Sequence, residues 1–231
     1  MSADFDLGNA RHERKFVASN RDYPIILNWL ENQPEFFRRQ YADRTVYSLY
    51  FDNHANDSFY DNLSGQSARS KVRLRWYDSP GGESDISFEA KIRRNALGWK
   101  IVERLGQIDQ FSALTWQQLG MLVHARLSED NRVRFAYYPT AVLLSGYRRE
   151  YFCSRDGKIR LTLDREHFAF DQRFGIAPNL TREFSVPNPL VAELKYAVSD
   201  KRQGDSVALR MPFRVSRHSK YVVNTSAMLN S

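Results

Sequence analysis

Most of the chain alternates between polar and apolar residues with a period of two, which predicts long β-strands. In residues 71–77 the basic side chains share one face, while Val72, Leu74 and Trp76 share the other. The same alternation recurs in residues 12–17, 86–93, 158–164 and 191–196. We therefore expect a sheet whose strands each have one apolar and one polar face.

Three shorter stretches have the spacing of amphipathic helices: 23–32, 112–127 and 205–210. The first has Asp22 as its expected N-cap and Pro24 in its first turn, where proline is tolerated. The expected apolar stripe of the second is Leu114, Leu119, Leu122 and Val123. The third ends before Pro212.

The polar faces of the predicted strands are unusual because they carry Lys or Arg at alternate positions, with isolated carboxylates between them. Like charges directly opposite on neighbouring strands destabilise a sheet, so converging basic faces favour an anion between them. If helices cover the apolar faces, a closed barrel would enclose a lumen lined by cations. The carboxylates Glu13, Glu89 and Glu193 lie on these faces, and each is expected either to bind a metal or to pair with a neighbouring cation.

Composition and charge narrow the class of protein. The 231 residues are 42% hydrophobic, which is enough for a packed core, and we expect one domain over 1–231. The net charge of +7 favours an anionic partner. A single cysteine, Cys153, excludes an intrachain disulfide. With no secretory signal in residues 1–10 and no long apolar run, the expectation is a soluble, cytoplasmic protein without a membrane segment.

Eight short segments, in this order, carry a resemblance that extends along almost the whole chain. They are RHERKF (11–16), SLYFD (48–52), KVRLRWY (71–77), FEAK (88–91), YRR (147–149), RLTLD (160–164), ELK (193–195) and SKY (219–221). The chain resembles the polyphosphate polymerase (VTC) domain of the triphosphate tunnel metalloenzyme superfamily. Glycine-rich phosphate-binding loops are absent from the sequence, so any nucleotide would be bound without them.

The resemblance implies an α+β fold: a closed, antiparallel, eight-stranded β-barrel tunnel with helices packed outside. It implies transfer of the ATP γ-phosphate to a growing polyphosphate chain with Mn²⁺ or Mg²⁺. The implied partners are ATP, phosphate and polyphosphate but no nucleic acid, and any membrane partner would be a separate chain.

The resemblance also implies the site residues. The implied catalytic cations are Lys15, Arg73, Arg75, Lys91, Lys100, Arg149, Arg160 and Lys220. The implied substrate-binding residues are Tyr147, Lys195 and Ser219, and Glu193 is the implied metal ligand. The lysine after Lys91 has an ambiguous register, and Lys100 is preferred to Arg104.

One departure and two rival functions remain open. The related CYTH-type enzymes begin with E-x-E-x-K, whereas this chain has Arg11 in place of the first Glu. That difference favours the polymerase branch over a hydrolase. The same tunnel could nevertheless hydrolyse tripolyphosphate or nucleoside triphosphates, or bind polyphosphate or RNA without catalysis.

Overall fold

The computed structural model describes residues 11–79, 81, 84–95 and 97–230, and the expectation about residues 1–10 lies outside this range. The chain divides into two compact units, each assembled from three separate segments. Unit 1 contains Met1–Arg44, Arg148–Glu166 and Asn188–His218. Unit 2 contains Thr45–Tyr147, His167–Pro187 and Ser219–Ser231. Each unit is described here by itself.

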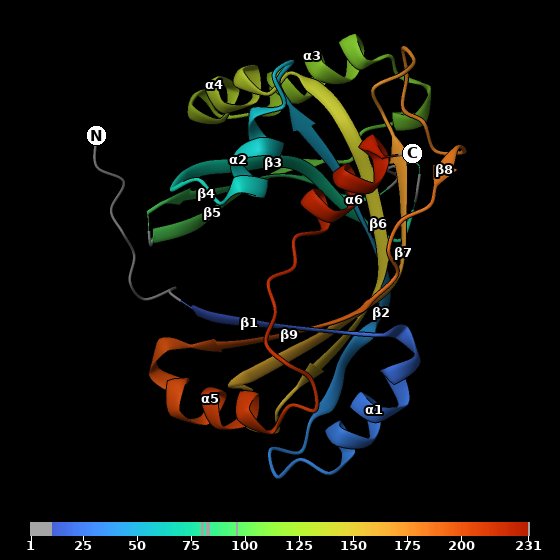
Figure 1. Ribbon diagram of the computed structural model, residues 1–231. Helices are drawn as coiled ribbons and strands as arrows, with labels where there is room; N and C mark the ends of the chain where they lie inside the picture. The colour runs from blue at the N-terminus through green and yellow to red at the C-terminus, as the bar shows by residue number, and fades with distance from the viewer. Residues whose placement is uncertain (1–10, 80, 82–83, 96, 231) are drawn as a thin grey trace. The chain divides into compact units, whose positions relative to one another are not determined.

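The strands confirm the period-two pattern. They are β1 (Arg11–Ala18), β2 (Arg38–Asp52), β3 (Ala68–Tyr77), β4 (Ile86–Arg94), β5 (Leu97–Gly106), β6 (Thr140–Cys153), β7 (Ile159–Asp171), β8 (Glu183–Phe184) and β9 (Leu190–Ala197). Their order in the sheet is β1-β9-β7-β6-β2-β3-β4-β5, and β8 pairs with β7 (Figure 1). Antiparallel register is seen in β1–β9, β7–β9, β2–β3, β3–β4 and β4–β5.

The expected closed barrel is wrong for the part of the chain that the structure describes, because the strand order has two ends, β1 and β5. The outer edge of β1 is instead occupied locally within unit 1. Phe16 forms an isolated antiparallel bridge with Val215, and the backbone N–H of Ser216 donates to the carbonyl of Lys15 at 2.8 Å. The structure confirms the α+β class, the antiparallel pairing and a series of eight hydrogen-bonded strands. It does not confirm that these strands close into a barrel.

The three helices predicted from amphipathic spacing are present, with shifted ends. The helices are α1 (Tyr23–Glu31), α2 (Asp57–Ser64), α3 (Trp116–Arg126), α4 (Glu129–Tyr137), α5 (Lys201–Arg210) and α6 (Lys220–Leu229). Asp22 stands at the N-cap of α1, but its side chain makes no cap hydrogen bond there. The predicted second helix begins later, at Trp116, because Thr115 and Gln118 form a capping box. Leu122 was wrongly assigned to the apolar stripe, since it is 36% exposed.

The third predicted helix begins earlier than expected, at Lys201, and three helices were not predicted. The start of α6 contains the β-branched run Val222–Val223 and Thr225, whose intrinsic preference is for strand. Its N-terminus is fixed by Ser219, whose side chain accepts from the backbone N–H of Val222. In α4 the buried residues are Asn131 and Phe135, and only one of them is apolar. The helix therefore lacks the apolar stripe by which an amphipathic helix is recognised in a sequence.

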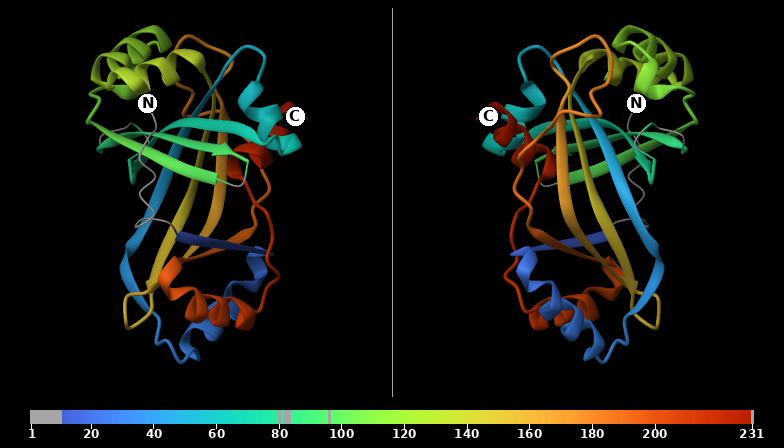
Figure 2. Two further views of the ribbon diagram at one scale, coloured as in Figure 1. Left: turned by 90° about the vertical axis from the view of Figure 1, so that its left-hand side faces the viewer. Right: turned by 90° about the vertical axis from the view of Figure 1, so that its right-hand side faces the viewer.

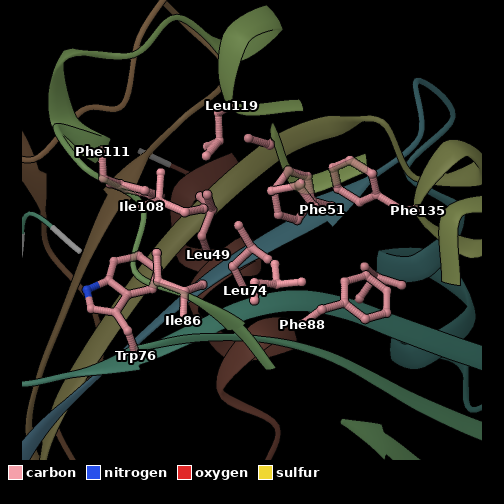
Figure 3. Packing of buried hydrophobic residues seen from close by; sticks show 14 of the residues in the cluster. Leu49, Phe51, Leu74, Trp76, Ile86, Phe88, Ile108, Phe111, Leu119 and Phe135 are labelled. Atoms are coloured by element: carbon pink, nitrogen blue, oxygen red, sulfur yellow. The ribbon is translucent and has the colours of Figure 1, made fainter. Parts of the chain in front are cut away.

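The core of unit 2 lies on the apolar face of β3 and β4. Leu74, Trp76 and Phe88 are fully buried and pack with residues of β2 and of α3 (Figure 3). Figure 3 also shows Leu119 and Phe135 directed toward this cluster from the helices. Because successive strand residues point to opposite faces, burial of this face directs Arg73, Arg75 and Glu89 to the other one.

The core of unit 1 is built in the same way. Phe16, Leu161 and Leu194 are buried against α1 and α5, which lie side by side against β1 and β9 in Figures 1 and 2. Tyr196 is also fully buried, and its ring lies over Gly204 of α5. A Cβ at Gly204 would lie 2.2 Å from that ring, so only glycine permits this approach.

We expect Gly204→Ala to destabilise the protein by about 1–3 kcal/mol, because the added methyl group must displace the Tyr196 ring. The matched control is Gly120→Ala in α3, where a Cβ would have no neighbour within 4 Å. That change should be neutral or stabilising by up to about 1 kcal/mol, because alanine favours helix. Urea unfolding measures both, and equal effects of the two substitutions would contradict the prediction.

Candidate functional site

The polar faces of β3, β4 and β5 form a continuous surface in unit 2. The register places Arg73 opposite Glu89 and Lys71 opposite Lys91, and Lys91 is in turn opposite Lys100. Arg73, Lys91 and Lys100 had been identified from the sequence as site residues, so three separate strands bring them to one face. The ladder itself therefore fixes their relative positions.

Glu89 is the centre of the interactions on this face. Its Oε2 atom accepts from Nε and Nη2 of Arg73 at 2.8 and 2.5 Å, and its Oε1 atom accepts from Nζ of Lys100 at 2.5 Å. Nη1 of Arg75 lies 3.7 Å from Oε2. Nη1 of Arg73 donates to the hydroxyl of Tyr50 at 3.0 Å. We call Tyr50, Arg73, Arg75, Glu89 and Lys100 the Glu89 cluster.

Burial and charge act in opposite directions on the groups of this cluster. Burial raises the pKa of Glu89, but the charges of Arg73, Arg75 and Lys100 outweigh it and lower the pKa from 4.5 to about 2. The pKa of Lys100 is lowered overall, because burial and the charges of Arg73 and Arg75 outweigh the attraction of the adjacent Glu89. The carboxylate is therefore fully ionised at neutral pH, and three cations share its single negative charge.

The N-terminus of α6 adds further groups to the same face. Nζ of Lys71 donates to Oγ of Ser219 at 3.0 Å. Nζ of Lys220 lies 4.2 Å from the centre of the Tyr147 ring, whose hydroxyl accepts from Nη2 of Arg75 at 3.0 Å. Ser219, Lys220 and Tyr147 were predicted as site residues, and the structure brings all three close to the Glu89 cluster or to its strands.

A buried carboxylate anchors α6. Asp52 is fully buried, and it accepts from the hydroxyl of Tyr221 at 2.6 Å and from the backbone N–H groups of Ser58 and Phe59 in α2. The Tyr221 ring stacks on Tyr50 with centroids 4.8 Å apart. Because Tyr221 directly follows Lys220, this anchor fixes the position from which Lys220 and Ser219 reach the polar face.

Unit 1 contains a second group of charges, centred on Glu193. Its Oε1 atom lies 3.2 Å from Nζ of Lys195, and its Oε2 atom lies 3.6 Å from Nη2 of Arg149. Nε and Nη2 of Arg149 also donate to the two oxygens of the buried Asp164, at 2.6 and 2.8 Å. On β1, Nζ of Lys15 lies 3.2 Å from Oε1 of Glu13. We call Glu13, Lys15, Arg149, Asp164, Glu193 and Lys195 the Glu193 cluster.

The charges of the Glu193 cluster stabilise one another. Burial raises the pKa of Glu193, but Lys195, Lys15 and Arg149 outweigh it and hold the pKa well below the usual range. Burial lowers the pKa of Lys15, yet Glu193, Glu13 and Asp164 together raise it more, so the pKa is raised overall. Glu193 and Lys15 are therefore both charged at neutral pH.

The structure thus divides the predicted site residues between the two units. Unit 2 holds Arg73, Arg75, Lys91, Lys100, Tyr147, Ser219 and Lys220; unit 1 holds Lys15, Arg149, Arg160, Glu193 and Lys195. Arg160 is exposed and pairs across strands with Lys195. Glu13, Glu89 and Glu193 each form an ion pair with a neighbouring cation.

Sequence reasoning missed three residues that hold the site cations or α6 in place: Tyr50, Asp52 and Asp164. All three fall within segments that carried the family resemblance, SLYFD and RLTLD. Their positions were therefore available from the sequence. Their partners were not. Tyr221, the partner of Asp52, is distant in the chain, and Arg149, the partner of Asp164, lies on another strand.

Comparison with known families decides the classification. The model of the VTC domain matches residues 10–229 of the chain. The chain belongs to the VTC domain family. The resemblance expected from the eight short segments is thereby confirmed.

Two solved structures share a distant likeness with this VTC domain. The PH1819 protein from Pyrococcus horikoshii OT3 is 12% identical with a TM-score of 0.48, over 94% of this chain and 98% of that one. A Vibrio parahaemolyticus protein described as a candidate adenylate cyclase is 14% identical with a TM-score of 0.49, over 93% and 97% of the two chains. No curated protein matches the chain.

Within the part of this VTC domain that the structure describes, no helix is both long and apolar enough to cross a membrane. In the same residues, no group of three or more His, Cys, Asp or Glu side chains could hold a metal ion.

The ionised Glu89 side chain should make the stability of the protein depend on pH in the acid range. Because its folded pKa of about 2 lies below the usual 4.5, its ionised form contributes fully above pH 5, and this contribution is lost as the pH falls toward 2. The shift corresponds to about 3 kcal/mol at most. We expect Glu89→Gln to reduce the fall in unfolding free energy between pH 5 and pH 2, as measured by urea unfolding. An unchanged pH dependence would contradict this assignment.

The anchor of α6 gives a separate prediction. Tyr221→Phe removes a hydrogen bond to a buried, charged acceptor, so it should cost about 1.5–3 kcal/mol of unfolding free energy. The matched control is Tyr137→Phe, which removes a 3.3 Å contact to Asp57 on the exposed surface and should cost less than about 0.5 kcal/mol. Thermal and urea unfolding compare the two, and equal losses would exclude an anchoring role for Tyr221.

Proposed function

We propose that this VTC domain is a polyphosphate polymerase that transfers the γ-phosphate of ATP to the end of a polyphosphate chain. The observation that carries the proposal is the Glu89 cluster. Arg73, Arg75 and Lys100 converge there on one carboxylate, and Lys71, Lys91 and Lys220 lie on the same three strands or at the adjoining helix end. Cations in such excess over carboxylates fit a multiply charged anion.

Phosphoryl transfer suits this arrangement because it depends mainly on positioning and on neutralisation of charge. The Arg73 and Arg75 guanidinium groups would bind phosphate oxygens, and Glu89 orients them until the anion arrives. Lys100 and Lys220 would add charge, and Ser219 would donate a hydrogen bond. Lys15, Arg149, Arg160 and Lys195 are assigned the same phosphate-binding chemistry in unit 1.

In the proposed reaction, a terminal oxygen of the acceptor chain attacks the γ-phosphorus of ATP. The bond from that phosphorus to the bridging β–γ oxygen breaks, and ADP leaves with both electrons of the bond. The acceptor grows by one phosphate, and no covalent intermediate with the protein is needed. Hydrolysis to orthophosphate differs only in that water is the acceptor, so product analysis separates the two activities.

A divalent metal, Mn²⁺ or Mg²⁺, is part of the proposal. It fits the Glu193 cluster only if phosphate oxygens of the substrate supply some of its ligands. The described residues offer no set of three protein ligands, and Glu193 is already paired with Lys195 and Arg149. A hard divalent cation is often held by one or two carboxylates together with phosphate oxygens. Glu193 would hold the metal with Glu13 beside it, and the metal would neutralise charge on the phosphate oxygens.

The function is tested with purified protein, ATP and Mn²⁺, with and without a short polyphosphate primer. Gel electrophoresis and phosphorus NMR should show long phosphate chains and release of ADP. Lys100→Ala and Glu193→Ala should each reduce turnover by at least tenfold, because each removes a charge assigned to phosphate or metal. Arg94→Ala serves as the control, since Arg94 is exposed and its side chain is on the opposite face of β4 from Glu89.

Each other outcome has a definite meaning. Orthophosphate without chains would replace the polymerase with a triphosphatase. Tight polyphosphate binding without turnover would make the domain a binding module. Full activity in both the Lys100 and Glu193 variants would contradict the assigned roles.

A further inference from the structure

Two tyrosines of unit 1 form an aromatic pair on neighbouring strands of the sheet. Tyr41 of β2 and Tyr151 of β6 have ring centroids 5.7 Å apart and ring planes at 86°, an edge-to-face arrangement. Such a pair contributes about 0.5–1.5 kcal/mol and restrains the orientation of both rings. Tyr41 is nevertheless 54% exposed. The pair therefore presents an aromatic ring that is both held in place and accessible.

Tyr151 lies on the same face of β6 as the Glu193 cluster. It is two residues past Arg149, a member of that cluster, and successive strand residues alternate between faces. Glu150 and Phe152, on either side of Tyr151, lie on the other face. There Glu150 accepts from the hydroxyl of Tyr23 of α1 at 2.9 Å, and Phe152 packs in the core of unit 1. The tyrosine pair therefore extends the charged face and not the core.

The strand register places Tyr151 in one row with Glu193, the proposed metal ligand. The backbone N–H of Ser154 donates to the carbonyl of Ile159 at 2.9 Å, and in an antiparallel pair this register puts Tyr151 opposite Thr162. Thr162 is in turn opposite Glu193 on β9. Adjacent strands are about 4.8 Å apart, so Tyr151 lies roughly 10 Å from Glu193 across the sheet.

That separation suits a nucleoside triphosphate. In an extended nucleotide, the ribose and the α-phosphate hold the base away from the β- and γ-phosphates by a distance of the same order. If the terminal phosphates of ATP lie at the Glu193 cluster, its adenine can reach the tyrosine pair. Stacking on an aromatic side chain stabilises a bound base by about 1–3 kcal/mol.

The tyrosines that contact the arginines of the Glu89 cluster offer no such ring. Tyr50 and Tyr147 are 5% and 3% exposed, and their hydroxyls accept from Arg73 and Arg75. A base has no access to either ring, whereas about half of Tyr41 is exposed. Cations that can bind phosphate are present in both units, so the accessible ring is the feature that favours unit 1 for the nucleoside.

We propose that the ring of Tyr41, supported by Tyr151, stacks on the base of ATP while the Glu193 cluster binds the phosphates of the same molecule. This inference rests on the proposed function and deepens it, because it names the subsite for the nucleoside. It makes the binding of ATP depend on Tyr41. The binding of tripolyphosphate, which has no base, does not depend on it.

The test measures, by calorimetry in Mn²⁺, the binding of a non-hydrolysable ATP analogue and of tripolyphosphate. We expect Tyr41→Ala to weaken binding of the ATP analogue by about 5–100-fold, because stacking of about 1–3 kcal/mol is lost. Binding of tripolyphosphate should change less than twofold. Tyr41→Phe keeps the ring and removes only the hydroxyl, so its affinity for the ATP analogue should stay within about twofold of the wild type.

The matched control is Tyr60→Ala in unit 2. Tyr60 is also 54% exposed and is also paired at a steep angle with a neighbouring ring, that of Phe59. It lies on α2 between Asp57 and Asp61, in surroundings that do not favour a phosphate. This substitution should leave the binding of both ligands unchanged. Urea unfolding of each variant checks that the fold is retained.

The outcomes separate this inference from the function on which it rests. If the wild type binds both ligands and Tyr41→Ala leaves binding of the ATP analogue unchanged, the base subsite is overturned and the function stands. Equal weakening of both ligands by Tyr41→Ala would also overturn it, because the defect would then lie in phosphate binding. A loss in Tyr41→Phe as large as in Tyr41→Ala would exclude stacking. Failure of the wild type to bind either ligand would overturn the proposed function first.

Discussion

The candidate site in unit 2 depends on the placement of one carboxylate, Glu89, among several cations. Without Glu89, the positive charges of Arg73, Arg75 and Lys100 would face one another on a partly buried surface with no negative charge between them. In the Glu193 cluster three carboxylates, Glu13, Asp164 and Glu193, face three cations, Lys15, Arg149 and Lys195. In unit 2, by contrast, the single charge of Glu89 holds three cations in the folded protein yet leaves an excess for a more highly charged anion. That excess is the physical basis of the proposed phosphate chemistry.

The rest of the fold serves to hold those charges at fixed positions. On β3 and β4 the apolar face is buried against α3 and α4, so the opposite face cannot rotate away. On β1 and β9 the buried face packs on α1 and α5. The charged side chains are thus fixed by apolar packing on the other side of the same strands. A loop-borne site would lack this rigidity.

Helix α6 shows how a distant element completes the arrangement. Asp52 ends β2 and caps the start of α2, and its remaining acceptor capacity binds Tyr221. One buried carboxylate therefore joins a strand and two helices, and through Tyr221 it sets the position of Lys220 and Ser219. The Tyr221–Tyr50 stack continues this connection to Arg73.

The sequence alone determined which residues share a face, because the period of two in a strand depends only on the chain. It therefore predicted the polar face of Arg73 and Arg75 and the strand nature of β1, β3, β4, β7 and β9. The resemblance of eight short segments, a separate signal, indicated the family. Tertiary structure decided the partners. The hydrogen bonds of Arg149 to Asp164 and of Tyr221 to Asp52, and the pairing of the β1 edge with Val215, join residues that no local pattern connects. It also decided that α6 is a helix despite its β-branched residues, because capping by Ser219 and burial of Tyr221 outweigh local preference.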